Sequence, residues 1–369
     1  MSDELSGALD LVTESIGDRA GEWDIAGELA LGVLRTLSAR GVLCAQVPAE
    51  HGGLGLSSMD NGTLTAHLGE LCSSVRSVAT SQGMAAWTIT RFGGRHQKST
   101  FLPRLTGGEL AGVAFSEPGA GSDLSAMTTE IRSDGESVVV TGHKVWVTVG
   151  HYADLLVVFG RYGAGAGAVV VPTNTPGVRV TRVPDPLGCR AAGHAEVRLD
   201  DVRLPADHLL KGAGQPLILL VTSALTYGRL SVAWGCVGIL RACLAATAAH
   251  ARARRQFGEP LAAHQLVQRH LAELLVAEQV ATRMSEYASR CWDDHLPEMV
   301  TSAVLAKHVA AGNASAGASA AVQVLASSGA TDGHVVARAY RDAKLMEIIE
   351  GSTEICQLLL ADHALAVTP

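Results

Sequence analysis

The apolar residues of this chain change their spacing twice, and that change restricts the possible folds more than any other feature. In residues 6–104 they recur every three or four positions, as at Ile25 and Leu29, which is typical of amphipathic helices. In residues 110–210 they form short β-branched runs separated by turn residues. From residue 214 onward the helical spacing returns. The sequence therefore predicts an α+β protein whose regions are helical, then β, then helical.

The 369 residues exceed the usual size of one hydrophobic core, and the changes of spacing predict three domains. We expect residues 1–110 to form an all-helical domain, residues 111–213 a β domain and residues 214–369 a second helical domain, a helical bundle. One long helix is expected from His264 to Trp292 and a buried helix, rich in small residues, within residues 303–330. The apolar face of the first is predicted at Val267, Leu271, Leu274 and Leu275, and strands are predicted at residues 138–140, 145–149, 155–159, 169–171 and 178–180.

Composition and charge exclude several classes of function. The net charge of -7 and pI near 6.0 give no reason to expect nucleic acid or an anionic membrane as a partner. Seven cysteines occur without any Cys-x-x-Cys pair, so we expect buried thiols rather than a zinc site, another metal site or disulfides. The first thirty residues contain no apolar core of signal-peptide length, and no later stretch reaches the roughly 18 uninterrupted apolar residues of a membrane span, so a cytoplasmic protein is expected.

A glycine-rich run at residues 163–168 matches the loose dinucleotide-binding pattern G-x-G-x-x-A. That pattern needs a following helix whose N-terminus faces the pyrophosphate. Here the run lies between two predicted strands, so we interpret it as a plain hairpin.

A second glycine-rich run, residues 114–123, is a candidate ligand-binding loop. Ser116 and Ser122 supply hydroxyl groups, and the glycines, including Gly121, let backbone N–H groups approach a ligand closely. Asp123 can anchor the loop through nearby amides. A tight structural turn is the alternative interpretation.

About twenty residues later, Lys144-Val145-Trp146-Val147-Thr148 reads as a strand. Strand alternation places Trp146 and Thr148 on the same face. A flat aromatic beside a hydroxyl suits the isoalloxazine ring of a flavin, because the indole packs on the ring and the threonine bonds a ring nitrogen. A tryptophan in the core is the alternative.

Glu350 is the candidate proton-abstracting base. It lies between two isoleucines and Gly351, surroundings that raise the pKa of a carboxyl group by desolvating its charged form. A surface glutamate near a helix end is the alternative, and Glu347 and Glu354 are neighbours with the same chemistry.

Five segments, in order along almost the whole chain, resemble the acyl-CoA dehydrogenase family. Residues 114–126 resemble its first signature, residues 146–148 its flavin-contacting strand and residues 323–344 a later signature. Residues 47–56 are similar to its N-terminal Pro-x-x-x-Gly-Gly-Leu-Gly motif. Residues 254–265 resemble the segment that reaches the FAD of a neighbouring subunit.

The resemblance implies a fold and a set of site residues. The fold would comprise an N-terminal helical domain, a middle β-barrel-like domain and a C-terminal four-helix bundle, with FAD between the last two. Glu350 and Arg229 would be catalytic, and Ser122 and Gly351 would contact substrate. The cofactor-binding residues would be Phe115, Ser116, Gly121, Ser122, Trp146, Thr148, Arg254, Gln256, Phe257, Gln265, Gln323, Ser352 and Glu354.

The activity implied is FAD-dependent α,β-dehydrogenation of an acyl thioester on CoA or acyl carrier protein, by a homodimer or homotetramer that passes electrons to an acceptor such as an electron-transferring flavoprotein. Some branches place the base immediately before the arginine that matches Arg229. That position is Gly228 here, so the alternative base is absent.

The chain departs from the family pattern at Ala326-Ser327, Ile349 and Glu354, which weakens the adenosine assignments. Leu225 and Thr226, at pocket-lining positions, argue against assuming a fatty acyl substrate. These differences favour a branch similar to the acyl-carrier-protein dehydrogenases of methoxymalonyl extender-unit biosynthesis. A flavin oxidase or monooxygenase of the same fold, or a non-catalytic flavoprotein binding module, are the alternatives.

Overall fold

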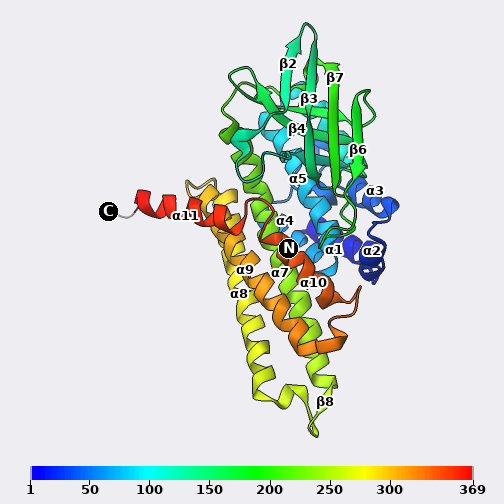
Figure 1. Ribbon diagram of the computed structural model, residues 1–369, viewed down its shortest axis with the longest axis vertical. Coiled ribbons are helices and arrows are strands. Elements are labelled where there is room, and N and C mark those ends of the chain that lie inside the picture. Colours follow the sequence, from blue (N-terminus) through cyan, green and yellow to red (C-terminus); the bar gives the residue numbers. More distant parts are fainter. Residues whose placement is uncertain (1, 368–369) are drawn as a thin grey trace.

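The computed structural model describes residues 2–367 and confirms the helical, β, helical order (Figure 1). Six helices precede the sheet, seven strands build it, and the helices that follow are interrupted by one small hairpin. The first helices are α1 (Asp3–Ile16), α2 (Ala20–Ala26), α3 (Leu31–Ala39), α4 (Ser58–Leu71), α5 (Ser73–Phe92) and α6 (Arg95–Thr106). The strands are β1 (Ala111–Ala114), β2 (Glu130–Asp134), β3 (Ser137–Val147), β4 (Leu155–Tyr162), β5 (Gly165–Pro172), β6 (Val178–Arg182) and β7 (Ala195–Pro205). The last elements are α7 (Leu217–Ala253), β8 (Arg255–Gln256), β9 (Glu259–Pro260), α8 (Gln265–Asp293), α9 (Met299–Leu325), α10 (Val335–Met346) and α11 (Thr353–Val367).

Helix α5 is the inner helix of the N-terminal region. Nearly all of its side chains are buried, because it packs against β1 on one side and against α7 on another. The outer helix α1 has the opposite character: Leu5, Ala8, Val12 and Ile16 form one buried stripe at helical spacing. The side chain of Ser2 accepts a hydrogen bond from Leu5 N and caps this helix.

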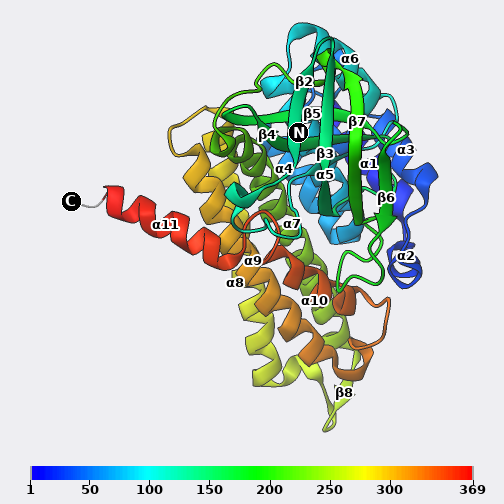
Figure 2. The same cartoon turned by 45° about the horizontal axis from the view of Figure 1, so that its top comes forward.

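The sheet is mixed, in the order β1-β4-β2-β3-β7-β6, with β5 paired to β4 (Figure 2). The central strand β4 is an unbroken apolar run from Leu155 to Phe159, fully buried as expected for a strand covered on both faces. β4 and β5 are antiparallel and joined at Gly163, whose φ is +56°. The glycine-rich run at residues 163–168 is therefore part of a hairpin, as predicted.

The predicted strand at residues 145–149 is not a separate element. β3 runs unbroken from Ser137 to Val147, and a bulge interrupts its pairing with β7 between Lys144 and Val147. At this bulge Trp146 has a φ of +55°, so simple alternation fails and Thr148 lies beyond the strand. Simple strand alternation therefore does not relate Trp146 to Thr148, although both side chains contact His194.

The C-terminal helices pack around α7, which contacts α4, α5, α8, α9 and α10. By length and composition α7 could cross a membrane, yet 61% of its most apolar window is buried inside the protein, so it is a core helix. Its close approach to α9 depends on the small residues predicted there: a Cβ on Gly317 would lie 2.7 Å from Leu240 Cδ2. α8 matches the predicted long helix, but Leu275 is exposed rather than on the buried face.

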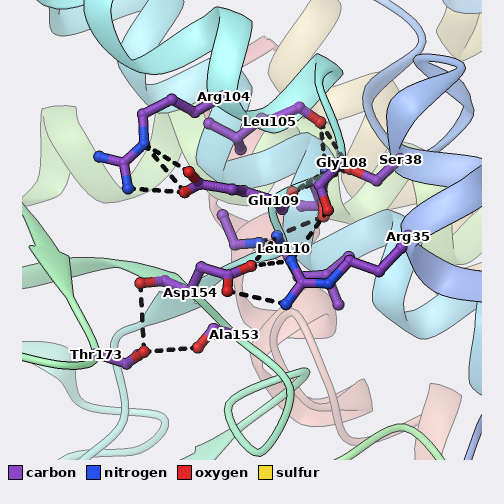
Figure 3. Close-up of polar contacts among 12 residues, drawn as sticks. Arg35, Ser38, Arg104, Leu105, Gly108, Glu109, Leu110, Ala153, Asp154 and Thr173 are labelled. Carbon is purple, nitrogen blue, oxygen red and sulfur yellow. Dashed lines mark hydrogen bonds and ion pairs between the residues drawn. The ribbon is translucent and has the colours of Figure 1, made fainter. Parts of the chain in front are cut away.

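A polar junction joins the N-terminal helices to the sheet (Figure 3). Arg35 on α3 forms an ion pair with Asp154 and donates to Gly108 O at 3.0 Å. Asp154, just before β4, also accepts from Leu110 N at 2.7 Å. Because the one carboxylate binds a helix and the segment entering β1, the sheet is fixed relative to the helices that cover it.

Candidate active site

The loop at residues 115–123 is held by a buried ion pair that the sequence analysis did not assign. Lys144 Nζ donates to Glu117 Oε1 at 2.8 Å and to Phe115 O at 3.0 Å, and both side chains are buried. The Glu117 carboxylate also accepts from the backbone N–H groups of Thr128 and Thr129 at 2.7 and 2.9 Å. The loop between these contacts is therefore fixed at both ends.

Electrostatics favour the charged carboxylate in this pair. Burial alone would raise the pKa of Glu117, but hydrogen bonds from Lys144, Thr128 and Thr129 outweigh it and lower the pKa to about 2. Burial lowers the pKa of Lys144 to about 8, against the opposing effect of Glu117.

The part of the loop between these anchors faces open space. A Cβ on Gly119 or Gly121 would meet no atom within 4 Å. Ser122 and Asp123 are exposed, and Asp123 accepts from Ser125 N at 3.0 Å, which confirms its anchoring role. The loop thus leaves its backbone groups and the Ser122 hydroxyl open to solvent.

Trp146 and Thr148 meet at a third residue, His194, which precedes β7. Thr148 Oγ1 lies 3.3 Å from His194 Nδ1, and the Trp146 and His194 rings pack edge to face at 5.8 Å. Trp146 is 56% exposed. Burial lowers the pKa of His194 to about 4, aided by the charge of Arg76, so the imidazole is neutral near pH 7. Its buried Nε2 has no hydrogen-bond partner within residues 2–367.

Glu350 lies in the turn between α10 and α11, with a φ of +56°, a left-handed conformation that is strained for a residue with a side chain. Its carboxylate rests against Gly228 of α7: a Cβ on that glycine would lie 2.7 Å from both Cδ and Oε2 of Glu350. Met84 Sδ of α5 borders the same space, at 2.8 Å from that Cβ position. The absence of a side chain at Gly228 is what leaves room for the carboxylate.

Two buried cations hold the backbone of this turn. Arg229 Nε donates to Glu350 O at 3.0 Å, and Lys307 Nζ donates to Gly351 O at 2.7 Å and to Glu347 O at 3.3 Å. Desolvation raises the pKa of Glu350 to about 7, although the charges of Arg229, Lys307 and Arg76 oppose the rise. A carboxyl group with this pKa can accept a proton near neutral pH.

Glu347 and Glu354 lie in different surroundings. The Glu347 carboxylate pairs with Lys344 at 2.9 Å and accepts from Ser315 at 3.2 Å. Glu354 is exposed, and a hydrogen bond from Ser352 lowers its pKa. Of the three glutamates in this segment, Glu350 therefore has the surroundings of a proton acceptor.

Helix α5 brings the two halves of the site together. Ser81 Oγ donates to Thr148 O at 3.2 Å, while Met84, almost one turn further on, borders the Glu350 carboxylate. The charge of Arg76, on the same helix, lowers the pKa of both His194 and Glu350. The aromatic segment and the candidate base thus face neighbouring turns of one helix.

The remaining predicted residues are not part of this cluster. Arg254, Gln256 and Phe257 lie in and beside the β8–β9 hairpin, at the end of the molecule opposite the sheet (Figure 1). Phe257 is 96% exposed, and Gln265 and Gln323 are also exposed. Within one chain these residues do not reach the candidate base.

Comparison with known proteins identifies the family. The acyl-CoA dehydrogenase N-terminal, middle and C-terminal domains match residues 6–109, 112–202 and 218–365. The chain belongs to the acyl-CoA dehydrogenase family. Among the curated members, the probable acyl-CoA dehydrogenase YngJ of Bacillus subtilis (strain 168) is 34% identical over 96% of this chain and 95% of its own. The human mitochondrial short-chain specific acyl-CoA dehydrogenase is 31% identical over 90% of this chain and 82% of its own.

Among solved structures, FkbI, described as acting in biosynthesis of the methoxymalonyl extender unit of the Fk520 polyketide, is 61% identical to this acyl-CoA dehydrogenase family member. The match covers 97% of this chain and 99% of FkbI, with a TM-score of 0.94. The predicted fold and family are therefore confirmed. Acyl-CoA dehydrogenases are FAD-dependent oxidoreductases that act on CH–CH groups.

The residues present fit FAD. The exposed indole of Trp146 offers a flat apolar surface, and His194 Nε2, beside it, lacks a partner in residues 2–367. The open loop around Gly119 and Gly121 leaves room for a ligand to approach the backbone. A flat heteroaromatic ring with a polar edge is a group of this shape and chemistry.

Sequence reasoning missed four residues that support the site: Glu117, Lys144, His194 and Lys307. A signal existed for two of them, because a lysine within an apolar strand or an Ala-rich helix needs a buried polar partner. For His194 no local pattern existed, because its neighbours come from a distant bulge.

Proposed function

We propose that this protein is an FAD-dependent dehydrogenase that introduces an α,β double bond into an acyl thioester. The observation that supports this most is the Glu350 carboxylate, whose pKa is raised to about 7 and which lies over Gly228. Removal of a thioester α-proton is most efficient with a base whose pKa is close to the working pH.

In this proposal Glu350 removes the α-proton. Arg229 holds Glu350 in place by donating a hydrogen bond to the backbone carbonyl of Glu350. Bound FAD supplies the acceptor for the hydride that leaves the β-carbon. The flavin would be held by Trp146 packed on its ring, by Ser116 at its pyrimidine edge and by Thr148 at its N5 side, while Phe115 and Gly121 would shape the loop. Ser122 and Gly351 would contact the substrate, and Ser352 and Glu354 would contact the cofactor from the turn after the base.

A second copy of the chain completes the cofactor site. Because the hairpin of Arg254, Gln256 and Phe257 lies far from the flavin-binding segments, we infer that it, with Gln265 and Gln323, serves the FAD of a neighbouring subunit. Exposed apolar side chains on α8 and α11 favour a homodimer or homotetramer. They are Leu266, Leu275, Val276, Val280, Leu358, Leu359 and Leu365.

The similarity to FkbI favours a small acyl group carried on an acyl carrier protein, within polyketide extender-unit biosynthesis. The human short-chain enzyme, at lower identity, favours a short acyl-CoA. We propose a soluble, cytoplasmic enzyme that passes electrons to an acceptor such as an electron-transferring flavoprotein.

The test is anaerobic bleaching of the FAD-loaded protein by short acyl thioesters, each presented on CoA and on a carrier protein. Glu350→Gln should bind FAD normally and lose roughly 10²- to 10⁴-fold in bleaching rate. Glu347→Gln is the matched control and should bleach nearly as the wild type does. If Glu350→Gln bleached at the wild-type rate, the proposal would be refuted. If Glu347→Gln were the inactive variant, the role of base would have to be reassigned to Glu347. Rapid reaction of the reduced flavin with oxygen would instead indicate an oxidase.

A further inference from the structure

Lys307 is a fully buried lysine whose hydrogen bonds go only to backbone carbonyls. It lies on α9, and its ammonium donates to Gly351 O at 2.7 Å and to Glu347 O at 3.3 Å. Within residues 2–367 no acidic side chain forms an ion pair with it. Burying an ammonium without a paired carboxylate is costly, so a lysine at this position calls for an explanation.

The two carbonyls that Lys307 binds stand on either side of Glu350. Glu347 O belongs to the turn that ends α10 and also accepts from Thr353 N at 2.9 Å. Gly351 follows the base and has a φ of +98°. Lys307 therefore bridges the two ends of the short segment in which Glu350 adopts its left-handed conformation.

Lys307 also acts on the base through its charge. The charged groups that face Glu350 come from three helices: Arg76 on α5, Arg229 on α7 and Lys307 on α9. All three lower the pKa of Glu350 against the larger, opposite effect of desolvation. Glu347 and Glu354 lie in and beside the same turn, but their carboxylates are occupied by Lys344 and Ser352.

We propose that Lys307 is a positioning residue for the base: its ammonium fixes the carbonyls on both sides of Glu350 and favours the ionised carboxylate. This inference rests on the proposed role of Glu350, and it adds a residue that does not touch the substrate. A neutral side chain at position 307 should let the turn relax and make the carboxylate harder to ionise.

The experiment titrates Glu350 directly in the FAD-loaded protein. Infrared difference spectra between each protein and its Glu350→Gln counterpart isolate the carbonyl stretch of the protonated carboxyl group, without any substrate. In Lys307→Met the midpoint should rise by roughly one pH unit, the usual effect of removing a nearby charge. Lys307→Arg, which keeps the charge, should titrate close to the wild type. If the methionine variant does not fold, Lys307→Gln replaces it.

Lys344→Met is the matched control, because Lys344 contacts Glu347 from the exposed side of the same turn. It should leave the midpoint unchanged. In bleaching assays with the thioester that reacts fastest, the acid limb of the pH profile should move upward only in the neutral variants at position 307. An unmoved midpoint in those variants, with rates lowered equally at every pH, would overturn the inference. A failure of Glu350→Gln to slow bleaching would refute the proposed function while the infrared result stood.

Discussion

The carboxylate of Glu350 occupies the space that a side chain at position 228 would need. A Cβ on Gly228 would lie 2.7 Å from the carboxyl carbon and 2.8 Å from Met84 Sδ. Contacts this short force a neighbour to move. The candidate base Glu350 therefore depends on a glycine at position 228, although the two residues lie on different elements, 122 positions apart.

Gly228→Ala should separate chemistry from binding. The new methyl group displaces the Glu350 carboxylate, and a shift of about 1 Å in a catalytic group can cost about 10²-fold in rate. Bleaching of the flavin by an acyl thioester should fall by that order, while FAD content stays normal. Gly312→Ala, on α9 with no atom within 4 Å of the new Cβ, is the control and should be active. Full activity in the Gly228 variant would show that the carboxylate tolerates displacement.

The rate of flavin reduction should rise with pH through about 7, because the proposed base Glu350 must be deprotonated to accept a proton and its pKa is raised to about 7. Above that pH the rate should level off. The measurement is the single-turnover bleaching rate across the pH range. A profile that is flat through neutrality would assign the base to a group with an ordinary carboxyl pKa.

The same pKa predicts an effect on stability. Because the pKa of Glu350 is raised from 4.5 to about 7, its favourable contribution is complete below pH 4.5 and is lost as pH rises to about 7. Glu350→Gln cannot ionise, so relative to the wild type its free energy of unfolding should increase over this window. Urea unfolding at several pH values measures the difference. If the difference in unfolding free energy between the two proteins did not change with pH, the Glu350 carboxyl group would have its ordinary pKa in the native state.

The Glu117–Lys144 pair should behave as a unit. Glu117→Gln leaves the Lys144 ammonium buried without its counter-charge, which costs roughly 3 to 5 kcal/mol in comparable pairs. FAD affinity should fall as well, since the loop at residues 115–123 loses its anchor. Adding Lys144→Met removes the unpaired charge and should restore part of the stability. Chemical unfolding measures the stability of each variant. If the double variant lost as much stability as the two single variants together, the pairing would be contradicted.

Arg254→Ala should weaken FAD binding by about tenfold to a hundredfold, the usual loss for a charge-assisted hydrogen bond. Arg252→Ala, two residues away and also exposed, is the control for general surface charge. Equilibrium titration of the apoprotein measures both affinities.

Sedimentation of the wild-type holoprotein should show no monomer at about micromolar concentration, as expected of a closed oligomer. A flavin-loaded monomer would exclude a shared cofactor site.

The order of regions and the hairpin at residues 163–168 could be predicted because they depend on local spacing and turn chemistry. Strand β7 escaped prediction although Val197, Leu199, Val202 and Leu204 alternate inward, because the extra residue at Asp200-Asp201 shifts the alternation. β2 has one buried side chain, Ile131, too weak a signal to distinguish a strand from a loop.

Within the site, Glu350 could be singled out from its apolar neighbours, but its contact with Gly228 could not. That contact depends on how α7 and the turn after α10 pack, which no local pattern records. The same holds for His194, whose partners lie at a bulge. Trp146, Phe257 and Glu350 all adopt left-handed conformations, which their residue types do not predict.

Helix α5 sets the spacing between the Thr148 segment and the candidate base, between which the proposed function places the substrate. Ser81 is hydrogen-bonded to the Thr148 segment and Met84 borders the base, and three helical residues span about 4.5 Å along an axis. The separation between these two segments therefore depends on the regular geometry of one helix as well as on contacts between the sheet and the C-terminal helices. A single residue inserted between Ser81 and Met84 would turn one contact about 100° away from the other, so this stretch of α5 should tolerate substitutions far better than changes of length.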